Sequence, residues 1–151
     1  MSEGRNTPLG FAANTWKNFE FIEQAAKDHP EYGLHPVTQL ALSLLGLIVL
    51  QHEKNRTQFN GKIRGMPLDS LNWPNWEMSN PINTLGQLIK QVRHVIAHGG
   101  ITYSSAHSQN FDDVLLTFYD PDSKWIGKIK AADLRTFCLR FKELLEQQNS
   151  N

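Results

Sequence analysis

Residues 81–100 read PINTLGQLIKQVRHVIAHGG, and this stretch has the pattern of a helix with two different faces. Pro81 suits a first helical turn, where its missing N–H costs nothing, and Gly99 or Gly100 is expected just past the end. At about 100° per residue, six aliphatic side chains fall within one arc and predict the face packed on the rest of the protein. They are Leu85, Leu88, Ile89, Val92, Val95 and Ile96.

The opposite side of this helix is polar in its last two turns. Arg93, His94 and His98 lie there, and Arg93 and His98 stand about 140° apart around the helix. Ala97 and Gly86 share the same sector and are small, so they leave room for another helix or for a ligand. The sequence therefore predicts a shallow recess flanked by Arg93 and His98.

Three further helices are predicted by apolar spacings of three and four residues. The first spans about residues 8–27, starting at a proline behind the capping side chain of Thr7. The second spans about residues 37–54 and is apolar almost all round, which is typical of a helix at the centre of a bundle. The last spans about residues 131–147 and carries Cys138 in its apolar stripe, so this thiol is expected in the core.

Residues 113–131, DVLLTFYDPDSKWIGKIKA, contain two β-prone runs around a turn signal at residues 120–123. This pattern predicts a β-hairpin, which needs support from the helices because a lone hairpin is marginal. The expected fold class is mainly α: a four-helix bundle with a small β-hairpin inserted before the last helix, in a single domain of residues 1–151.

Residues 55–80 show no sustained periodicity and predict a long loop with at most a short helical turn. Basic and aromatic residues alternate in it, a mixture suited to single-stranded RNA. The alternative, which we favour, is that the tryptophans cover one end of the bundle. The residues concerned are Arg56, Phe59, Lys62, Arg64, Trp73 and Trp76.

Composition limits the partners and the compartment. Fifteen basic and fifteen acidic side chains cancel, so any contact with nucleic acid must be local. The single cysteine cannot form an internal disulfide, and the first ten residues lack the pattern of a secretion signal. The longest apolar run, residues 41–50, is shorter than the roughly 20 residues that cross a bilayer. A reduced, cytoplasmic protein without a membrane contact is expected.

An arginine beside a histidine suits phosphodiester cleavage. Imidazole has an ordinary pKa of about 6.5 and exchanges protons near neutral pH, whereas guanidinium holds phosphate oxygens in a planar fork. The spacing alone is weak evidence, because six arginines and six histidines would produce it by chance roughly 0.24 times. Its position at a helix end, off the packed face and directly before two glycines, adds weight.

Structural explanations of the same residues stay open. His98 can simply oppose the negative end of the helix dipole, and Arg93 can form a salt bridge at the edge of the core. His94 and His98 could bind a metal ion, but no HExxH glutamate and no third ligand follow nearby in the sequence, so a metal-dependent hydrolase is the least favoured reading.

Arg93, the polar His94 and then His98 resemble the RxxxxH motif of HEPN domains, which lies on a late helix of an α-helical bundle. The order of elements, with AHGGI before a hairpin and AADLRTFCLRFKELL after it, is similar to a plasmid- or phage-associated bacterial subgroup of that family. The resemblance covers most of the chain, although residues 92–100 alone have the specificity of a motif.

The resemblance implies a metal-independent endoribonuclease that needs no cofactor and works as a homodimer through the face carrying Arg93 and His98. Cleavage would leave a 2′,3′-cyclic phosphate, in a toxin–antitoxin or anti-phage defence setting. Arg93 would bind the scissile phosphate, His98 would be the general acid or base, and His94 would orient or assist. The alternative is a non-catalytic HEPN-like module that partners a nucleotidyltransferase or an antitoxin.

Overall fold

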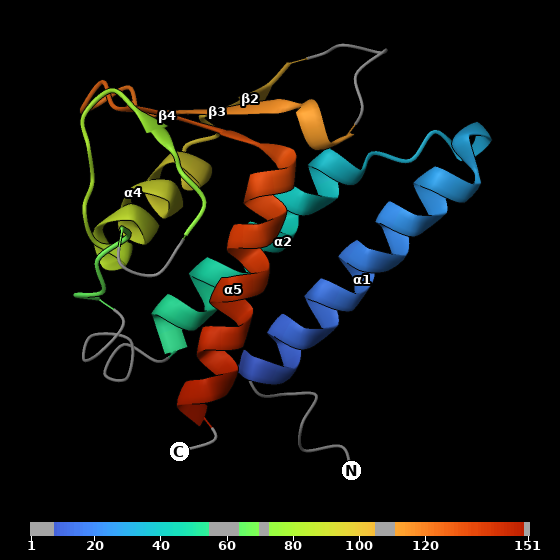
Figure 1. Ribbon diagram of the computed structural model, residues 1–151, viewed down its shortest axis with the longest axis horizontal. Coiled ribbons are helices and arrows are strands. Elements are labelled where there is room, and N and C mark those ends of the chain that lie inside the picture. The colour runs from blue at the N-terminus through green and yellow to red at the C-terminus, as the bar shows by residue number, and fades with distance from the viewer. Residues whose placement is uncertain (1–7, 55–63, 70–72, 105–110, 150–151) are drawn as a thin grey trace. The chain divides into compact units, whose positions relative to one another are not determined.

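The computed structural model describes residues 8–54, 64–69, 73–104 and 111–149 (Figure 1). The chain divides into two compact units. The first unit holds helices α1 (Pro8–Asp28) and α2 (Pro36–Lys54) and the part of helix α5 (Ala131–Asn149) from Cys138 onward. The second unit holds the sheet, helix α4 (Leu85–Ala97) and the start of α5. The described chain is mainly helical, as predicted. That the chain forms a single domain, and that its helices form a single bundle, stay predictions.

Helices α1 and α2 pack side by side in the first unit (Figure 1). Their observed bounds agree with the predicted ranges to within one residue, and the short 3-10 helix η2 (Pro30–Tyr32) follows α1. Trp16 and Phe19 of the predicted apolar face are buried, with ring centroids 5.2 Å apart. The Trp16 indole N–H donates to Glu20 one turn later at 2.9 Å, so the large ring is buried without losing its hydrogen bond.

Helix α2 buries one side of its apolar sequence. Leu40, Leu44 and Leu47 are fully buried, whereas Leu42 is 55% exposed. Ser43 is also buried, and its hydroxyl donates to the Gln39 carbonyl at 2.8 Å. Each fully buried leucine stabilises the fold by about 1.5–3 kcal/mol, so this side provides much of the core of the first unit.

Five of the six side chains in the predicted apolar stripe of α5 are buried, and the sixth, Leu144, is half-buried. Leu134, Phe137, Phe141 and Leu145 have at most 4% of their surface exposed. Cys138 lies in the same stripe and is fully buried. Burial raises the pKa of the Cys138 thiol, because desolvation disfavours the charged thiolate.

The Cys138 thiol is therefore expected to resist thiol–disulfide exchange in the folded protein and to react readily after unfolding. Reaction with a chromogenic disulfide reagent, in buffer and in concentrated guanidinium chloride, measures this difference. Rapid stoichiometric labelling of the native protein would show that Cys138 is accessible and that the stripe is open.

The second unit contains a four-stranded antiparallel sheet in the order β1-β4-β3-β2. The predicted hairpin is present as β3 (Leu115–Tyr119) and β4 (Ile126–Lys130), but β2 (Ile101–Tyr103) and β1 (Glu77–Met78) extend it on either side. The sequence thus predicted two of the four strands and underestimated the size of the sheet. Strands of two and three residues have no periodicity of their own and exist because their neighbours supply hydrogen bonds.

One face of the sheet is buried. Leu116 and Phe118 of β3 and Ile129 of β4 have almost no exposed surface, and these positions alternate with more exposed ones along each strand. Gly127 has a specific role, because a Cβ atom there would collide with the Trp125 ring. The Trp125 indole N–H in turn donates to the Asn80 carbonyl at 3.1 Å, which holds the chain before α4 against the hairpin.

Trp73 and Trp76 belong to the core rather than to an exposed nucleic-acid surface. Trp76 packs on Phe118 and Phe137 with ring centroids 5.2 and 5.7 Å apart, and Trp73 packs on Phe137 at 5.1 Å. Both tryptophans are less than 10% exposed, so they are not available for base stacking. The bundle end that they were expected to cover stays a prediction. Three members of the predicted basic-aromatic mixture, Arg56, Phe59 and Lys62, lie outside the described residues.

Helix α4 begins at Leu85, four residues later than predicted. The residues before it are extended, because Thr84 pairs with Pro67 in an isolated antiparallel bridge and the Leu68 N–H donates to the Asn83 carbonyl. Pro81 is compatible with extended backbone as well as with a first helical turn. Pairing with a distant segment decides between these two conformations.

Candidate functional site

Both ends of α4 are held by specific caps. At the start, the Thr84 side chain accepts a hydrogen bond from the Gln87 N–H at 3.4 Å. At the end, Gly99 takes a left-handed conformation with φ of 67°, which glycine adopts without steric cost. The Gly99 N–H donates to Ile96 and the Gly100 N–H to Val95, the pair of bonds that defines a Schellman motif.

Gly100 is required for a different reason. A Cβ atom there would collide with the Tyr119 carbonyl, and the Tyr119 N–H donates to the Gly100 carbonyl at 2.8 Å. This contact places the last turn of α4 next to the β3–β4 turn. The two glycines after the RxxxxH spacing thus have a structural explanation: one ends the helix and the other lets it lie against the sheet.

The two faces of α4 are divided as predicted. Five of the six predicted core side chains are buried, and Ile96 is half-buried. The five are Leu85, Leu88, Ile89, Val92 and Val95. On the other side, Arg93 and His94 are half-buried, and Ala97 and His98 are exposed. The structure therefore leaves the candidate residues accessible to a ligand.

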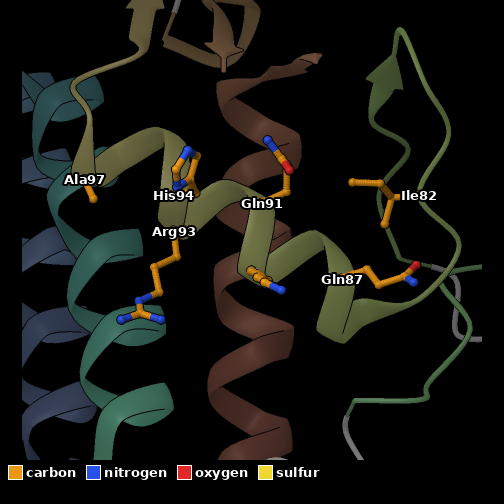
Figure 2. Close-up of a pocket in the computed structure, with 7 residues that line it drawn as sticks. Ile82, Gln87, Gln91, Arg93, His94 and Ala97 are labelled. Atoms are coloured by element: carbon orange, nitrogen blue, oxygen red, sulfur yellow. The ribbon is translucent and has the colours of Figure 1, made fainter. Parts of the chain in front are cut away.

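An open pocket of about 650 Å³ lies along the outer face of α4 (Figure 2). Its lining contains two cationic side chains, Lys90 and Arg93. The other lining side chains are two glutamines, one histidine and two apolar residues. The lining residues are Ile82, Gln87, Lys90, Gln91, Arg93, His94 and Ala97. An anionic group could reach both cations here, because the arginine guanidinium binds phosphate oxygens as a planar fork and the flexible lysine can follow as a point charge.

The pocket does not bring Arg93 and His98 together. Arg93 lines the pocket, and Figure 2 shows it leaving α4 in a different direction from His94. His98 is exposed and is not among the lining residues. Gly86, predicted to share the recess, is instead buried: a Cβ atom there would collide with the backbone of Arg64. Because Gly86 has no side chain, the backbone at Arg64 can pass close to the first turn of α4.

His94 and His98 form a pair beside the β3–β4 turn. Their ring centroids are 4.5 Å apart. Nε2 of His94 lies 3.3 Å from the Asp122 carboxylate and 3.5 Å from that of Asp120. Sequence analysis found no third metal ligand near the two histidines, whereas the fold brings Asp122 to them across 28 residues.

Asp120 is the residue that connects the turn to α4. Its carboxylate accepts hydrogen bonds from the Ser123 hydroxyl at 2.6 Å, from the Gln91 side chain at 2.9 Å and from the Asp122 N–H at 2.9 Å. Only 5% of its side-chain surface is exposed. The Ser123 and Gln91 hydrogen bonds lower the pKa of the Asp120 carboxyl, and they outweigh the opposing effect of desolvation. The group is a fixed negative charge beside His94.

Sequence reasoning missed Lys90, Gln91 and Asp120 as parts of this region. A signal existed for the first two: on the helical wheel, Lys90 falls between Arg93 and His94, and Gln91 falls beyond His94. Asp120, at the start of the predicted turn, indicated a hydrogen bond within the turn. It did not indicate the hydrogen bond to Gln91 on α4. That contact depends on how the hairpin returns to the helix.

No helix in the described ranges is both long enough and apolar enough to cross a membrane.

Over residues 1–151 the chain matches the family model described as HEPN pEK499 p136, and it belongs to this HEPN family. The resemblance drawn from Arg93, His94 and His98 is thereby confirmed at the level of the family. Membership suggests a nuclease or a HEPN-like module. Comparisons with curated proteins and with solved structures gave no match.

The variant Asp120→Asn is expected to lower the stability of the fold near neutral pH and to have less effect in acid. Because the folded-state pKa of Asp120 is lowered from its ordinary value of 3.8, the ionised carboxylate stabilises the fold above pH 3.8. This contribution is lost as the pH falls below that value towards the lowered pKa. Thermal unfolding, followed by circular dichroism at about pH 7 and about pH 3, measures the difference in Tm between variant and wild type.

The variant Asp112→Asn, in the exposed 3-10 helix η4 (Phe111–Asp113), is the matched control and should leave Tm nearly unchanged. A Tm difference for Asp120→Asn that is equally large at both pH values would show that the carboxylate charge is not what stabilises the turn.

Proposed function

We propose that this protein is a metal-independent endoribonuclease of the HEPN type, cleaving RNA by attack of the substrate's own 2′-hydroxyl. One observation carries the proposal: Arg93 and Lys90 line an open pocket on the same helix that presents the His94–His98 pair. Membership of the HEPN family supports it. The pocket offers anion binding, and the imidazoles offer proton transfer.

Arg93 would bind the scissile phosphate. Its guanidinium can donate two parallel hydrogen bonds to phosphate oxygens and stabilise the charge that grows on them in the transition state. Lys90, one helical turn earlier and in the same lining, would hold the same or the neighbouring phosphate as a mobile point charge. These cations supply the local attraction that the neutral net charge of the chain does not.

His98 would transfer the proton. In the proposed reaction the 2′-oxygen attacks phosphorus, its proton passes to a base, and the bond to the 5′-oxygen breaks as that oxygen receives a proton. The products are a 2′,3′-cyclic phosphate and a 5′-hydroxyl. His94, its ring 4.5 Å from that of His98 and its Nε2 beside Asp120, would orient His98 or assist the second proton transfer.

A homodimer would complete the site. Within one chain Arg93 and His94 line the pocket and His98 does not, so His98, acting as the proton-transfer group on a phosphate held by Arg93, would come from a second subunit. A two-fold axis near exposed Ala97 would bring the arginine of one subunit to the histidine of its partner. An anionic substrate would also reduce the repulsion between the cations that meet there.

The biological setting that the family resemblance implies is a bacterial toxin–antitoxin or anti-phage system, and we include it in the proposal. An antitoxin or a nucleotidyltransferase would then be the partner that controls cleavage.

Cleavage of end-labelled RNA in EDTA is expected for the wild type and is expected to fall with Arg93→Ala and His98→Ala. Loss of the proton-transfer group should cost about 10²–10⁴-fold in rate, and loss of the phosphate-binding arginine about 10²–10³-fold. Arg135→Ala and His35→Ala, which remove the same side-chain types from parts of the sequence outside α4, are the matched controls. RNA with 2′-O-methyl groups throughout should resist cleavage, because it lacks the attacking hydroxyl.

Equal cleavage by the wild type and both α4 variants would point to a contaminating nuclease and contradict the proposal. Absence of cleavage by the wild type on varied RNAs would favour the second class of function, a non-catalytic HEPN-like module. In that case His98→Ala would change neither RNA integrity nor cell growth.

Mixing the two inactive variants is expected to restore part of the activity. If a site takes Arg93 from one subunit and His98 from the other, a heterodimer of Arg93→Ala and His98→Ala contains one site with both side chains intact. The variants are mixed, given time to exchange subunits and assayed on the same RNA, with each variant alone as the control. A mixture no more active than its components, despite exchange shown by native mass spectrometry, would place both residues of a site in one chain.

A further inference from the structure

The two histidines and the β3–β4 turn form a group with the geometry of a metal site. His94, His98 and Asp122 each offer one ligand atom, and these atoms all lie within 4.8 Å of one another. In the part of the chain that the structure describes, this is the one group of three or more potential ligands found so close together. Its members come from the end of α4 and from a turn far along the sequence.

The distances fit a small tetrahedral ion. Bonds to zinc of about 2.0–2.2 Å imply about 3.3–3.6 Å between neighbouring ligand atoms in a tetrahedral site. Nε2 of His94 is already 3.3 Å from the Asp122 carboxylate. The remaining separations, at most 4.8 Å, can close by side-chain rotation, because His98 is exposed and the Asp122 side chain is 77% exposed. The same exposure lets an ion enter and a water complete the coordination.

The charge of the group suits a divalent cation. Two neutral imidazoles and the Asp122 carboxylate carry one negative charge, and the buried Asp120 carboxylate, 3.5 Å from Nε2 of His94, supplies a second. Asp120 also accepts the Asp122 N–H and so fixes the backbone that carries the third ligand. An outer carboxylate that orients ligands and balances charge is a recurring feature of zinc sites.

We infer that His94, His98 and Asp122 bind a transition-metal ion of the zinc class, with Asp120 as the outer carboxylate. Two imidazoles favour zinc, copper or nickel over magnesium and calcium, which prefer oxygen ligands.

Binding of this ion would inhibit RNA cleavage, a consequence that rests on the proposed function. A ring nitrogen of His98 that coordinates a metal cannot exchange a proton with the substrate. The ion would therefore act as an inhibitor and not as a cofactor.

The test is calorimetric titration of the EDTA-treated, dialysed full chain with ZnCl₂, repeated for Asp122→Asn and His98→Ala. One ion per His94–His98–Asp122 group is expected for the wild type, with affinity at least about 10-fold lower in each variant, since even outer ligands contribute 10–100-fold. The matched control is His29→Ala. It removes a histidine that also lies close to a carboxylate, 3.1 Å from that of Glu31, but that does not belong to the group. Circular dichroism checks that each variant is folded.

Failure to observe saturable zinc binding, or equal affinity in Asp122→Asn and the wild type, would overturn the site. This readout does not depend on nuclease activity, so it decides the site even if no RNA is cleaved. If RNA is cleaved, zinc should inhibit the wild type, EDTA should reverse the inhibition, and Asp122→Asn should cleave normally but need about 10-fold more zinc for the same inhibition. Cleavage unaffected by zinc at saturating occupancy would overturn the inhibitory role alone.

Discussion

The contact between the Asp120 carboxylate and helix α4 determines the chemistry of the second unit. Asp120 closes the β3–β4 turn through Ser123 and the Asp122 N–H, and it reaches the helix through Gln91. A buried carboxylate is stable only when its oxygens are hydrogen-bonded, and here both accept such bonds. The turn is therefore held against the helix end that carries the histidines, and the environment of His94 depends on this arrangement.

The face of α4 has two electrostatic regions. Lys90 and Arg93 make the pocket suitable for a phosphate, whereas Asp120 and Asp122 place negative charge beside the imidazoles. Asp120, beside His94, can orient that ring for proton transfer, whereas Asp122 would supply the ligand oxygen for a cation. One geometry therefore supports both the proposed cleavage of RNA and its proposed inhibition by a metal ion. The two proposals use His98 in mutually exclusive ways.

The long helices were predictable because their patterns are long. Periodic apolar spacing over about five turns predicted α1, α2 and α5 to within two residues at their ends, and the paired glycines predicted the end of α4. The β3–β4 hairpin was predictable from its turn residues. The strands β1 and β2 were not, because segments of two and three residues carry no pattern. The shifted start of α4 has a similar cause, since the backbone near Thr84 is set by pairing with Pro67.

By itself, the sequence determined the family, the two faces of α4 and the accessibility of Arg93, His94 and His98, because these follow from residue order and a helical period of 3.6. Tertiary structure alone decided which groups meet those side chains. It placed Asp120 and Asp122 beside His94, covered Gly86 with the chain at Arg64, and lined the pocket with Arg93 but not with His98. The physical reason is that a side chain's direction on its own helix is a local property, whereas its neighbours depend on how distant strands return to that helix.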